Sequence, residues 1–479
     1  MRRTLAFGAL LITLGGCSFI PNYERPALPV AGQYPLGAKQ SVPGTPSVAD
    51  LEWQSFFRSP VSRELITLAL DNNRDLRVAV ENIATAQANF HIQNASLFPA
   101  INAAGSGQFQ RTPADVSGSG SVYHLREYSL GASAMSYELD LFGKIRSQAK
   151  QAEEQSFSTA ETRWSTQISL IAQVESEYLA WLADEEAVRL SEDTARAQKH
   201  SFDLRKMTMS QGSGNELDVA QAETTYRTAQ ASVARYTRQA GQDMDELVLL
   251  IGASIPDRLR GQMMAEIGLK SHQLFPPVTA GLPSDLLQRR PDVRAAEYTL
   301  LAANANIGAA RAAFYPSVTL TGSGGAASSG LNHLFKPGQA SLLFEPQVSV
   351  PIFDAGKNLA SLDTAEIEKR IEIANYEKAI QSAFHDVSDA LIARAAYTSQ
   401  LRAQEKLVEA DQRYYDLSKA RFETGADNFL NVLVAQNSLF SAQLDLVTLR
   451  LSERQNLVSL YKALGGGWVR PGLVEASAK

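Results

Sequence analysis

Two long stretches of the chain, 144–211 and 357–424, contain neither glycine nor proline. Helices in globular domains usually span about 8 to 20 residues, so uninterrupted runs of this length favour a coiled coil. At 1.5 Å per residue, each run would be about 100 Å long if it were helical throughout. Every seventh residue is apolar, apart from Arg394, in the series Val174, Trp181, Val188, Ala195, Phe202 and Met209 and in the series Val387, Arg394, Leu401, Val408, Tyr415 and Phe422. The sequence therefore predicts two very long helices.

The two runs belong to an internal duplication. Residues 75–107 align without gaps on residues 292–324 with eleven identities, among them Asp75 with Asp292 and Pro99 with Pro316. Further along the chain, Gly143-Lys144 aligns with Gly356-Lys357, and Gly212 aligns with Gly425. Self-similarity at a nearly constant offset is typical of a tandem repeat, here about 215 residues long.

A further helix is predicted after Gly425. Apart from Asn437 and Arg454, apolar residues recur in two heptad series, Leu430, Asn437, Leu444, Leu451 and Val458, and Leu433, Phe440, Val447, Arg454 and Tyr461. This a/d pattern over more than four heptads is typical of a coiled coil. An ordinary buried helix is the alternative interpretation.

Four segments between the helices alternate with a period of two. We expect strands at about residues 99–110, 128–138, 316–326 and 341–350. Each is about ten residues long, the length that a tilted strand needs to cross a bilayer. Gly/Ser-rich loops join the strands of each pair, and aromatic residues lie near the strand ends, as in membrane β-barrels. Pro346 argues against the fourth strand, since proline forfeits a ladder hydrogen bond.

The amino-terminal residues are typical of a secretory signal. Arg2 and Arg3 precede a short apolar segment, and Gly15 and Gly16 precede Cys17, the only cysteine. This segment resembles a bacterial lipoprotein box, which implies an N-palmitoyl, S-diacylglycerol lipid on Cys17 and no other cofactor. Ser18 in the next position favours the outer membrane by the same resemblance. Such a lipid anchors a protein to a leaflet without spanning it.

Composition excludes several classes of function. A net charge of -6 gives no reason to expect a nucleic-acid partner. One cysteine allows no intrachain disulfide and no four-thiolate metal site, and the six histidines are scattered. Gly322-Ser323-Gly324-Gly325 lacks a complete phosphate-loop pattern, so we expect no catalytic residue and no enzyme. After the signal, no apolar stretch approaches the length of a membrane-spanning helix, so we expect any crossing of a membrane to be by strands.

Four strands cannot close a barrel. An open sheet in lipid would leave two edges of unpaired backbone, which costs several kcal/mol per group. Three copies would supply twelve strands, enough to begin enclosing a channel. We therefore expect a homotrimer.

Five motifs resemble those of the TolC/OprM-type outer-membrane factors, in their lipoprotein (NodT) branch. They are Glu-Leu-Asp-Leu-Phe-Gly at 138–143, Gly-Leu-Pro-Ser-Asp-Leu-Leu-Gln-Arg-Arg-Pro-Asp at 281–292, Ile-Gly-Ala-Ala-Arg-Ala-Ala-Phe-Tyr-Pro at 307–316, Pro-Ile-Phe at 351–353 and Tyr-Lys-Ala-Leu-Gly-Gly-Gly-Trp at 461–468. The resemblance implies a mainly α fold with a β-barrel part, in which a twelve-stranded barrel is continued by a periplasmic α-helical barrel. It also implies the exit duct of a tripartite drug-efflux pump, with a periplasmic adaptor and an RND-type inner-membrane transporter as partners.

This interpretation divides the chain into five parts. They are a signal peptide (1–16), a lipid-anchored extended segment (17–60), a first repeat (61–270), a second repeat (271–465) and a C-terminal equatorial segment (466–479).

The resemblance also assigns functional residues at the helix tips, 205–217 and 421–430. Adaptor docking is expected around Arg205, Gly212, Arg421 and Gly425. The gate residues expected by the same resemblance are Leu430, Asp218, Phe422, Asp427, Val434 and Asn437. In the family this segment often reads Leu-Asp-Ala-Gln-Arg, whereas this chain has Leu-Val-Ala-Gln-Asn at 433–437. We therefore expect a closed state held less by ionic contacts at Val434 and more by Leu430, Asp218 and Asp427.

The sequence is also compatible with other functions. Metal-ion efflux and type I protein secretion use the same kind of duct. A lipid-anchored periplasmic coiled-coil adaptor is a competitor of another class, although such proteins lack duplicated pairs of strands.

Overall fold

The computed structural model describes residues 18–32, 34, 51–118, 120–268, 274–276 and 290–466. The predicted signal peptide, Cys17 and residues 467–479 lie outside the described residues. The chain forms two compact units, each drawn from both repeats. Unit 1 comprises residues 1–27, 82–160 and 295–377, and unit 2 comprises residues 28–81, 161–294 and 378–479.

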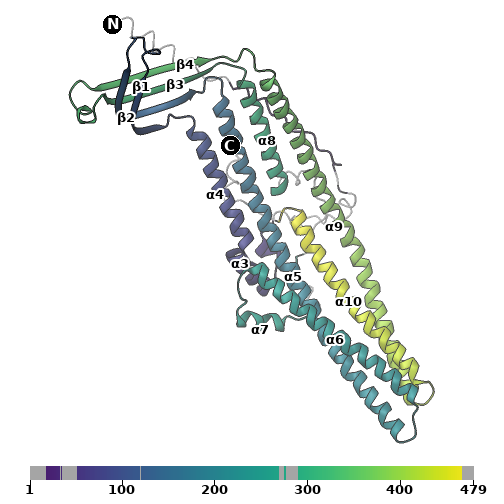
Figure 1. Ribbon diagram of the computed structural model, residues 1–479. Helices are drawn as coiled ribbons and strands as arrows, with labels where there is room; N and C mark the ends of the chain where they lie inside the picture. The colour runs from purple at the N-terminus through teal and green to yellow at the C-terminus, as the bar shows by residue number, and fades with distance from the viewer. Residues whose placement is uncertain are drawn as a thin grey trace. The chain divides into compact units, whose positions relative to one another are not determined.

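Unit 1 contains a four-stranded antiparallel sheet in the order β1-β2-β3-β4 (Figure 1). The strands are β1 (Ile101–Thr112), β2 (Tyr123–Leu139), β3 (Ser317–Ser328) and β4 (Ala340–Ser349). All four predicted strands are confirmed, but β2 begins before its predicted start because it pairs with β1 up to the hairpin loop. Pro346 lies in β4, which is an edge strand of this sheet, where proline is tolerated.

The sheet has one apolar and one polar face, because neighbouring residues of a strand point to opposite sides. Cross-strand pairs place Phe109, Leu130, Leu320, Leu342, Phe344 and Val348 on the apolar face. The same pairs place Gln108, Glu127, Thr319, Thr321, Glu345 and Gln347 on the polar face. Leu342 and Phe344 are 88% and 69% exposed, so the apolar face is not covered within the described chain.

The contact between β2 and β3 requires glycine. Gly131 pairs with Gly325, and a Cβ atom on Gly131 would lie 2.5 Å from the carbonyl oxygen of Gly324. Nearby, a β-bulge between Ala134 and Tyr137 interrupts the register, with Ser136 at a φ of 53°. Bulges of this kind increase the local twist of a strand.

The two long helices are present as predicted. They are α5 (Lys144–Ser210) and α9 (Lys357–Glu423), each of 67 residues. An aspartate precedes the start of each helix, although the two aspartates do not align in the duplication. The Asp140 carboxylate accepts hydrogen bonds from the backbone N–H groups of Ile145 and Arg146, and the Asp354 carboxylate accepts one from that of Asn358. An acceptor at this position satisfies N–H groups that have no partner within the helix.

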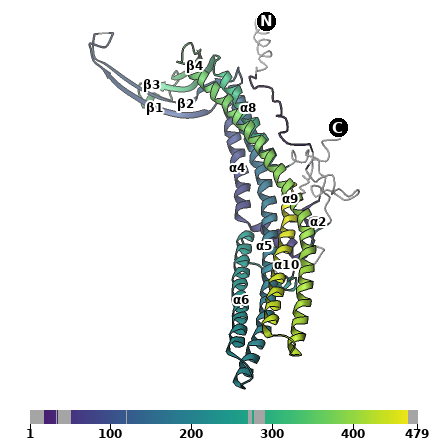
Figure 2. The same cartoon turned by 90° about the vertical axis from the view of Figure 1, so that its right-hand side faces the viewer.

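The remaining helices of the described residues are α2 (Trp53–Phe56), α3 (Pro60–Asn72), α4 (Arg74–Ala95), α6 (Glu216–Ile251), α7 (Asp257–Ala265), α8 (Pro291–Ala312) and α10 (Phe429–Ala463), with the 3-10 turn η4 (Leu331–His333). In both views α6 lies beside α5 and α10 lies beside α9 (Figure 1 and Figure 2). The core of unit 2 includes the fully buried side chains of Phe56, Phe57, Tyr178 and Tyr461. The parts of the two helical hairpins that follow residues 160 and 377 belong to unit 2.

The segment that follows Cys17 packs along α8 in unit 1. Phe19 stacks on Tyr315 with ring centroids 4.6 Å apart, and Glu297 accepts hydrogen bonds from Arg25 and Tyr23. Gly308 leaves room for Ile20, since a Cβ atom there would lie 2.6 Å from the Ile20 side chain. This segment is fixed by side-chain contacts although it has no regular secondary structure.

Arg290, in the Arg-Arg-Pro-Asp motif, joins three helices in unit 2. Its buried guanidinium donates to Asp292 at the start of α8, to Asp386 on α9 and to the carbonyl oxygen of Ala463 at the end of α10. A buried cation with these partners satisfies a helix C-terminus and holds the three helices together.

One predicted seam of α10 is wrong near its start. Leu430 and Asn437 are exposed, whereas Phe429, Val432, Leu433 and Leu439 are buried. The buried face of the helix follows the ordinary α-helical period and is rotated away from the first heptad series. By length and composition α10 is also apolar enough to cross a membrane, and 44% of its most apolar 18-residue window is buried inside the protein.

Candidate gate and docking site at the helix tips

The two tip turns have the same hydrogen-bonding pattern. Gly212 and Gly425 have φ values of 76° and 75°, in the left-handed region that favours glycine. The Gly212 N–H donates to the carbonyl oxygen of Met209, and the N–H of Ser213 donates to that of Thr208. The second turn repeats both bonds at Gly425 and Ala426. Each turn is therefore a Schellman motif that ends a 67-residue helix.

Asparagine caps the helix that follows each turn. The Asn215 side chain accepts a hydrogen bond from the backbone N–H of Asp218 and donates one to its carboxylate. The Asn428 side chain accepts from the backbone N–H of Asn431 at 3.2 Å. These are side-chain caps of the usual type, and the predicted gate residue Asp218 is part of one of them.

Asp427 is held by three donors within its own turn. It accepts hydrogen bonds from the backbone N–H of Asn428, from the side-chain amide of Asn431 and from Arg421 at 3.3 Å. These bonds, led by the one from Asn428, lower the pKa of the Asp427 carboxyl below its usual value. Arg421 and Asp427 thus form an ion pair across the second turn, within one subunit.

Arg205 connects the two hairpins. Its guanidinium lies 4.5 Å from the ring centroid of Phe422 and 4.2 Å from that of Phe429, so it stacks on both rings. Desolvation by burial lowers the pKa of Arg205. Nearby, Ala222, Phe429, Val432 and Leu433 form a small core. The predicted docking residue Arg205 and the predicted gate residue Phe422 are therefore in direct contact.

Leu430, Val434 and Asn437 lie on one exposed face of α10. Leu430 and Val434 are each 46% exposed, and Asn437 is exposed as well. Spacings of three and four continue this exposed face along the helix through Ser441, Asp445 and Thr448. We name these six residues the exposed α10 stripe; the opposite face of α10 is buried.

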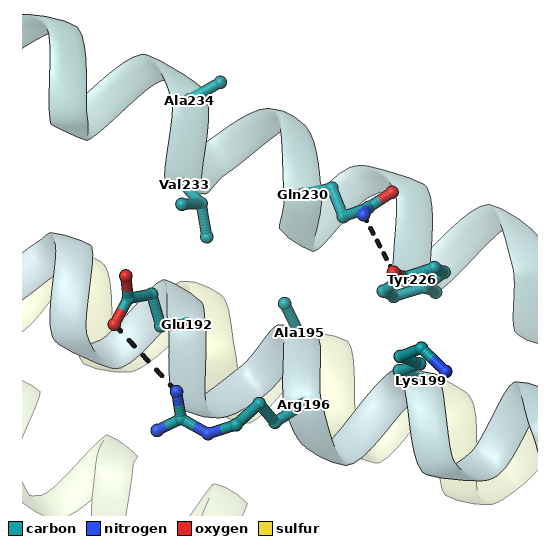
Figure 3. A pocket seen from close by; sticks show the side chains of 8 residues that line it. All are labelled: Glu192, Ala195, Arg196, Lys199, Tyr226, Gln230, Val233 and Ala234. Carbon is teal, nitrogen blue, oxygen red and sulfur yellow. Dashed lines mark hydrogen bonds and ion pairs between the residues drawn. The ribbon is translucent and has the colours of Figure 1, made fainter.

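A groove of about 420 Å³ lies between α5 and α6 (Figure 3). Small apolar side chains line part of it, namely Ala195, Val233 and Ala234. Figure 3 shows polar groups beside them, including the ion pair of Glu192 with Arg196 and the hydrogen bond from Gln230 to the Tyr226 hydroxyl. This α5/α6 groove combines small apolar side chains with charged edges.

Sequence reasoning missed several tip residues. Asn215, Asn428 and Phe429 were not predicted, although asparagine just before a helix start is a recognisable N-cap signal. The stacking of Arg205 on Phe429 has no local signal, since it joins the two repeats. Among the described residues, no group of three or more His, Cys, Asp or Glu side chains is arranged to hold a metal ion.

Comparison with known proteins agrees with this architecture. The sequence matches the family described as "Outer membrane efflux protein" over residues 65–253 and 282–466, one stretch in each repeat. It is 46% identical over 466 residues to two proteins of Pseudomonas putida, the antibiotic efflux pump outer membrane protein ArpC and the toluene efflux pump outer membrane protein TtgC. The match covers 97% of this chain and 95% of each relative.

A solved structure has the same fold. The open state of the MtrE outer membrane channel of Neisseria gonorrhoeae matches with a TM-score of 0.84 and 34% identity, over 94% of this chain and 98% of that one. These similarities decide against the adaptor alternative. The chain is a member of the outer membrane efflux protein family, with a TolC-like fold and a location in the outer membrane.

Proposed function

We propose that three copies of the chain form the exit duct of a tripartite efflux system. The observation that carries this proposal is the four-stranded sheet, which has two open edges, β1 and β4, and an uncovered apolar face. Backbone groups at a sheet edge need partners in lipid, and identical neighbours supply them when β1 of one copy pairs with β4 of the next. Twelve strands then enclose a channel.

In this proposal the exposed α10 stripe lines the periplasmic end of the pore. The stripe is exposed in the single subunit, and a threefold arrangement brings three copies of it together. Leu430, the stripe residue nearest the tip, forms an apolar constriction, and Val434 gives the next level no charge. Asp218 and Asp427 support the closed tip through their turns, because each is already bonded within its own hairpin.

The helix tips and the α5/α6 groove are the proposed docking surfaces for the periplasmic adaptor. The small side chains of Ala195 and Ala234 permit a close approach by another helix, and Arg196 and Lys199 offer charged contacts beside them. An inner-membrane transporter of the RND type is the proposed source of energy. The expectation that the chain is not an enzyme rests on its family, whose members are outer-membrane efflux proteins.

The proposed cargo is a range of toxic organic compounds. Two relatives are named for antibiotic efflux and toluene efflux, and each covers nearly the whole of this chain. A lipid on Cys17 is proposed as the anchor to the inner leaflet. No observation on this chain favours metal ions or secreted proteins as cargo.

Two measurements test the proposal. Purified full-length protein in detergent should have the mass of a trimer and should form ion-conducting channels in planar bilayers. Deletion of the gene should sensitise cells to chemically diverse amphiphiles, and complementation should restore resistance. A monomer without channel activity would contradict the duct, and sensitivity to metal ions alone would contradict the proposed cargo.

A further inference from the structure

Basic residues stand at one end of the apolar face of the sheet. In the β1–β2 register, Arg111 pairs with His124 and Phe109 pairs with Arg126. Paired residues share a face, so these basic side chains lie on the same side as Phe109 and Leu130 rather than on the polar side with Gln108 and Glu127.

This basic patch, Arg111, His124 and Arg126, has no acidic neighbour on its own face. None of the residues that the strand pairings place on the apolar face is Asp or Glu. All three basic side chains are exposed, and none forms a salt bridge within the described part of the chain. The patch therefore presents uncompensated positive charge beside an apolar surface.

The patch lies at the hairpin end of β1 and β2. Helices α4 and α5 connect to the opposite end of the two strands, near Ile101 and Leu139, within unit 1. The rings of Phe109 and Tyr128 pack edge to face beside the patch, with centroids 5.4 Å apart. If the helices project into the periplasm, as the proposed function requires, the patch is at the level of the outer leaflet.

The cost of placing arginine in lipid restricts the depth at which such a patch can lie and the groups that can cover it. An arginine on the lipid face of a barrel is strongly destabilising at the bilayer midplane and nearly neutral near the interface. The two arginines therefore belong at the headgroup level. A guanidinium group donates paired hydrogen bonds to phosphate. A headgroup without phosphate or carboxylate has no matching pair of acceptors.

We propose that Arg111, Arg126 and His124 bind the phosphate groups of an acylated glycolipid, the class of lipid that forms the outer leaflet of outer membranes. Its acyl chains lie along the apolar face, beside Phe109 and Leu130. The inference rests on the proposed function for the orientation of the sheet. It adds a specific lipid site on the outside of the barrel.

The experiment measures binding of bisphosphorylated lipid A to the purified full-length protein by native mass spectrometry in detergent. The double variant Arg111→Gln/Arg126→Gln should bind at least about tenfold more weakly, since charge-assisted hydrogen bonds to phosphate are lost. Arg111→Lys/Arg126→Lys should retain part of the affinity. The matched control, Arg74→Gln/Arg260→Gln, removes two exposed arginines from the helical part and should bind like the wild type.

Three further ligands identify the source of the phosphate. Dephosphorylated lipid A and inorganic phosphate should each bind much more weakly than lipid A. Equal binding of phosphatidylglycerol, or equal binding of lipid A by the double glutamine variant and the wild type, would overturn the proposal. A lack of channel conductance in the same preparation would instead contradict the proposed function, while the binding comparison still decides whether these residues form a lipid site.

Discussion

The guanidinium of Arg205 lies 4.2 Å from the ring centroid of Phe429, although these residues belong to different repeats. Phe422 contributes a second ring at 4.5 Å, so the cation is held between two aromatic side chains of the second hairpin. A cation–π contact is worth about 0.5–1 kcal/mol when exposed and about 2 kcal/mol when desolvated. Arg205 is partly buried, so this contact ties the two tips of a subunit together.

Replacing Arg205 should loosen the tip locally. We expect Arg205→Ala to raise the rate of amide hydrogen exchange around both turns by about 5- to 30-fold, which corresponds to a loss of about 1–2 kcal/mol. Lys206→Ala is the matched control, because Lys206 is exposed and adjacent. Unchanged exchange in Arg205→Ala, or an equal increase in the control, would show that the stacking does not hold the hairpins.

Substitutions at Gly425 test the tip turn, because they affect only the conformation of the backbone there. A Cβ atom at Gly425 would meet nothing within 4 Å, but its φ of 75° disfavours other residues. A left-handed residue costs about 1–2 kcal/mol for most side chains, whereas asparagine tolerates this conformation. Gly425→Val should therefore reduce drug resistance in a complemented deletion strain, and Gly425→Asn should preserve most of it. Equal resistance with both variants would mean that the turn is not critical.

A charge introduced at Val434 tests whether α10 lines the pore. Val434→Asp would place three carboxylates at one level of a trimer, and we expect greater cation selectivity in single-channel reversal potentials. Gln436→Asp adds the same charge to the same helix outside the exposed α10 stripe and should change selectivity less. If Val434→Asp conducts like the wild type, Val434 does not face the lumen.

Much of the fold could be predicted because its signals are periodic. The long helices follow from runs without glycine or proline, and the strands follow from alternation near Ile101 and Val318. The heptad series alone did not indicate that Leu430 is exposed in the subunit, because such a series shows which residues share a face but not which neighbour that face meets.

The contacts between the repeats had no sequence signal either. Arg205 was expected at the tip as a docking residue, but its aromatic partners belong to the other repeat and no spacing rule connects them. The pairing of Asp184 on α5 with Asp243 on α6 was missed because its two carboxylates come from different helices. Such contacts depend on how two helices are rotated about their axes, which local sequence leaves open.

The Asp184–Asp243 pair should make stability depend on pH. Burial, followed by the nearby charges of Asp184 and Glu177, raises the pKa of Asp243 to about 7. Burial also raises the pKa of Asp184, although Arg235 and Arg238 partly oppose it. The pKa of an aspartate in the unfolded chain is about 3.9. The folded state therefore binds more protons between about pH 4 and pH 7, and its stability should fall as the pH rises through this range.

Asp243→Asn should remove most of this slope. The measurement is the midpoint of thermal dissociation of the purified protein at several pH values between about 4.5 and 8. Asp245→Asn is the control, because Asp245 is an exposed residue of the same helix. If the slope persisted in Asp243→Asn but disappeared in Asp245→Asn, Asp245 and not Asp243 would be the source of the pH dependence.

Assembly of the strands should depend on the glycines between β2 and β3. Gly131 faces Gly325 across the strands, and a Cβ atom on Gly131 would lie 2.5 Å from the Gly324 carbonyl oxygen. That contact is with backbone, so relief requires the strands to shift, at a cost of about 1–3 kcal/mol in each copy. Because a trimer would contain three such contacts, Gly131→Val should reduce the yield of heat-modifiable oligomer on gels.

Gly107→Ala is the matched control for this change. Gly107 lies in β1 of the same sheet, and a Cβ atom there would meet its nearest neighbour, the Phe109 ring, at an ordinary 3.5 Å. This variant should therefore assemble like the wild type. Normal assembly of Gly131→Val would indicate that β2 and β3 can separate without loss of the barrel, whereas failure of both variants would point to a general intolerance of side chains on these strands.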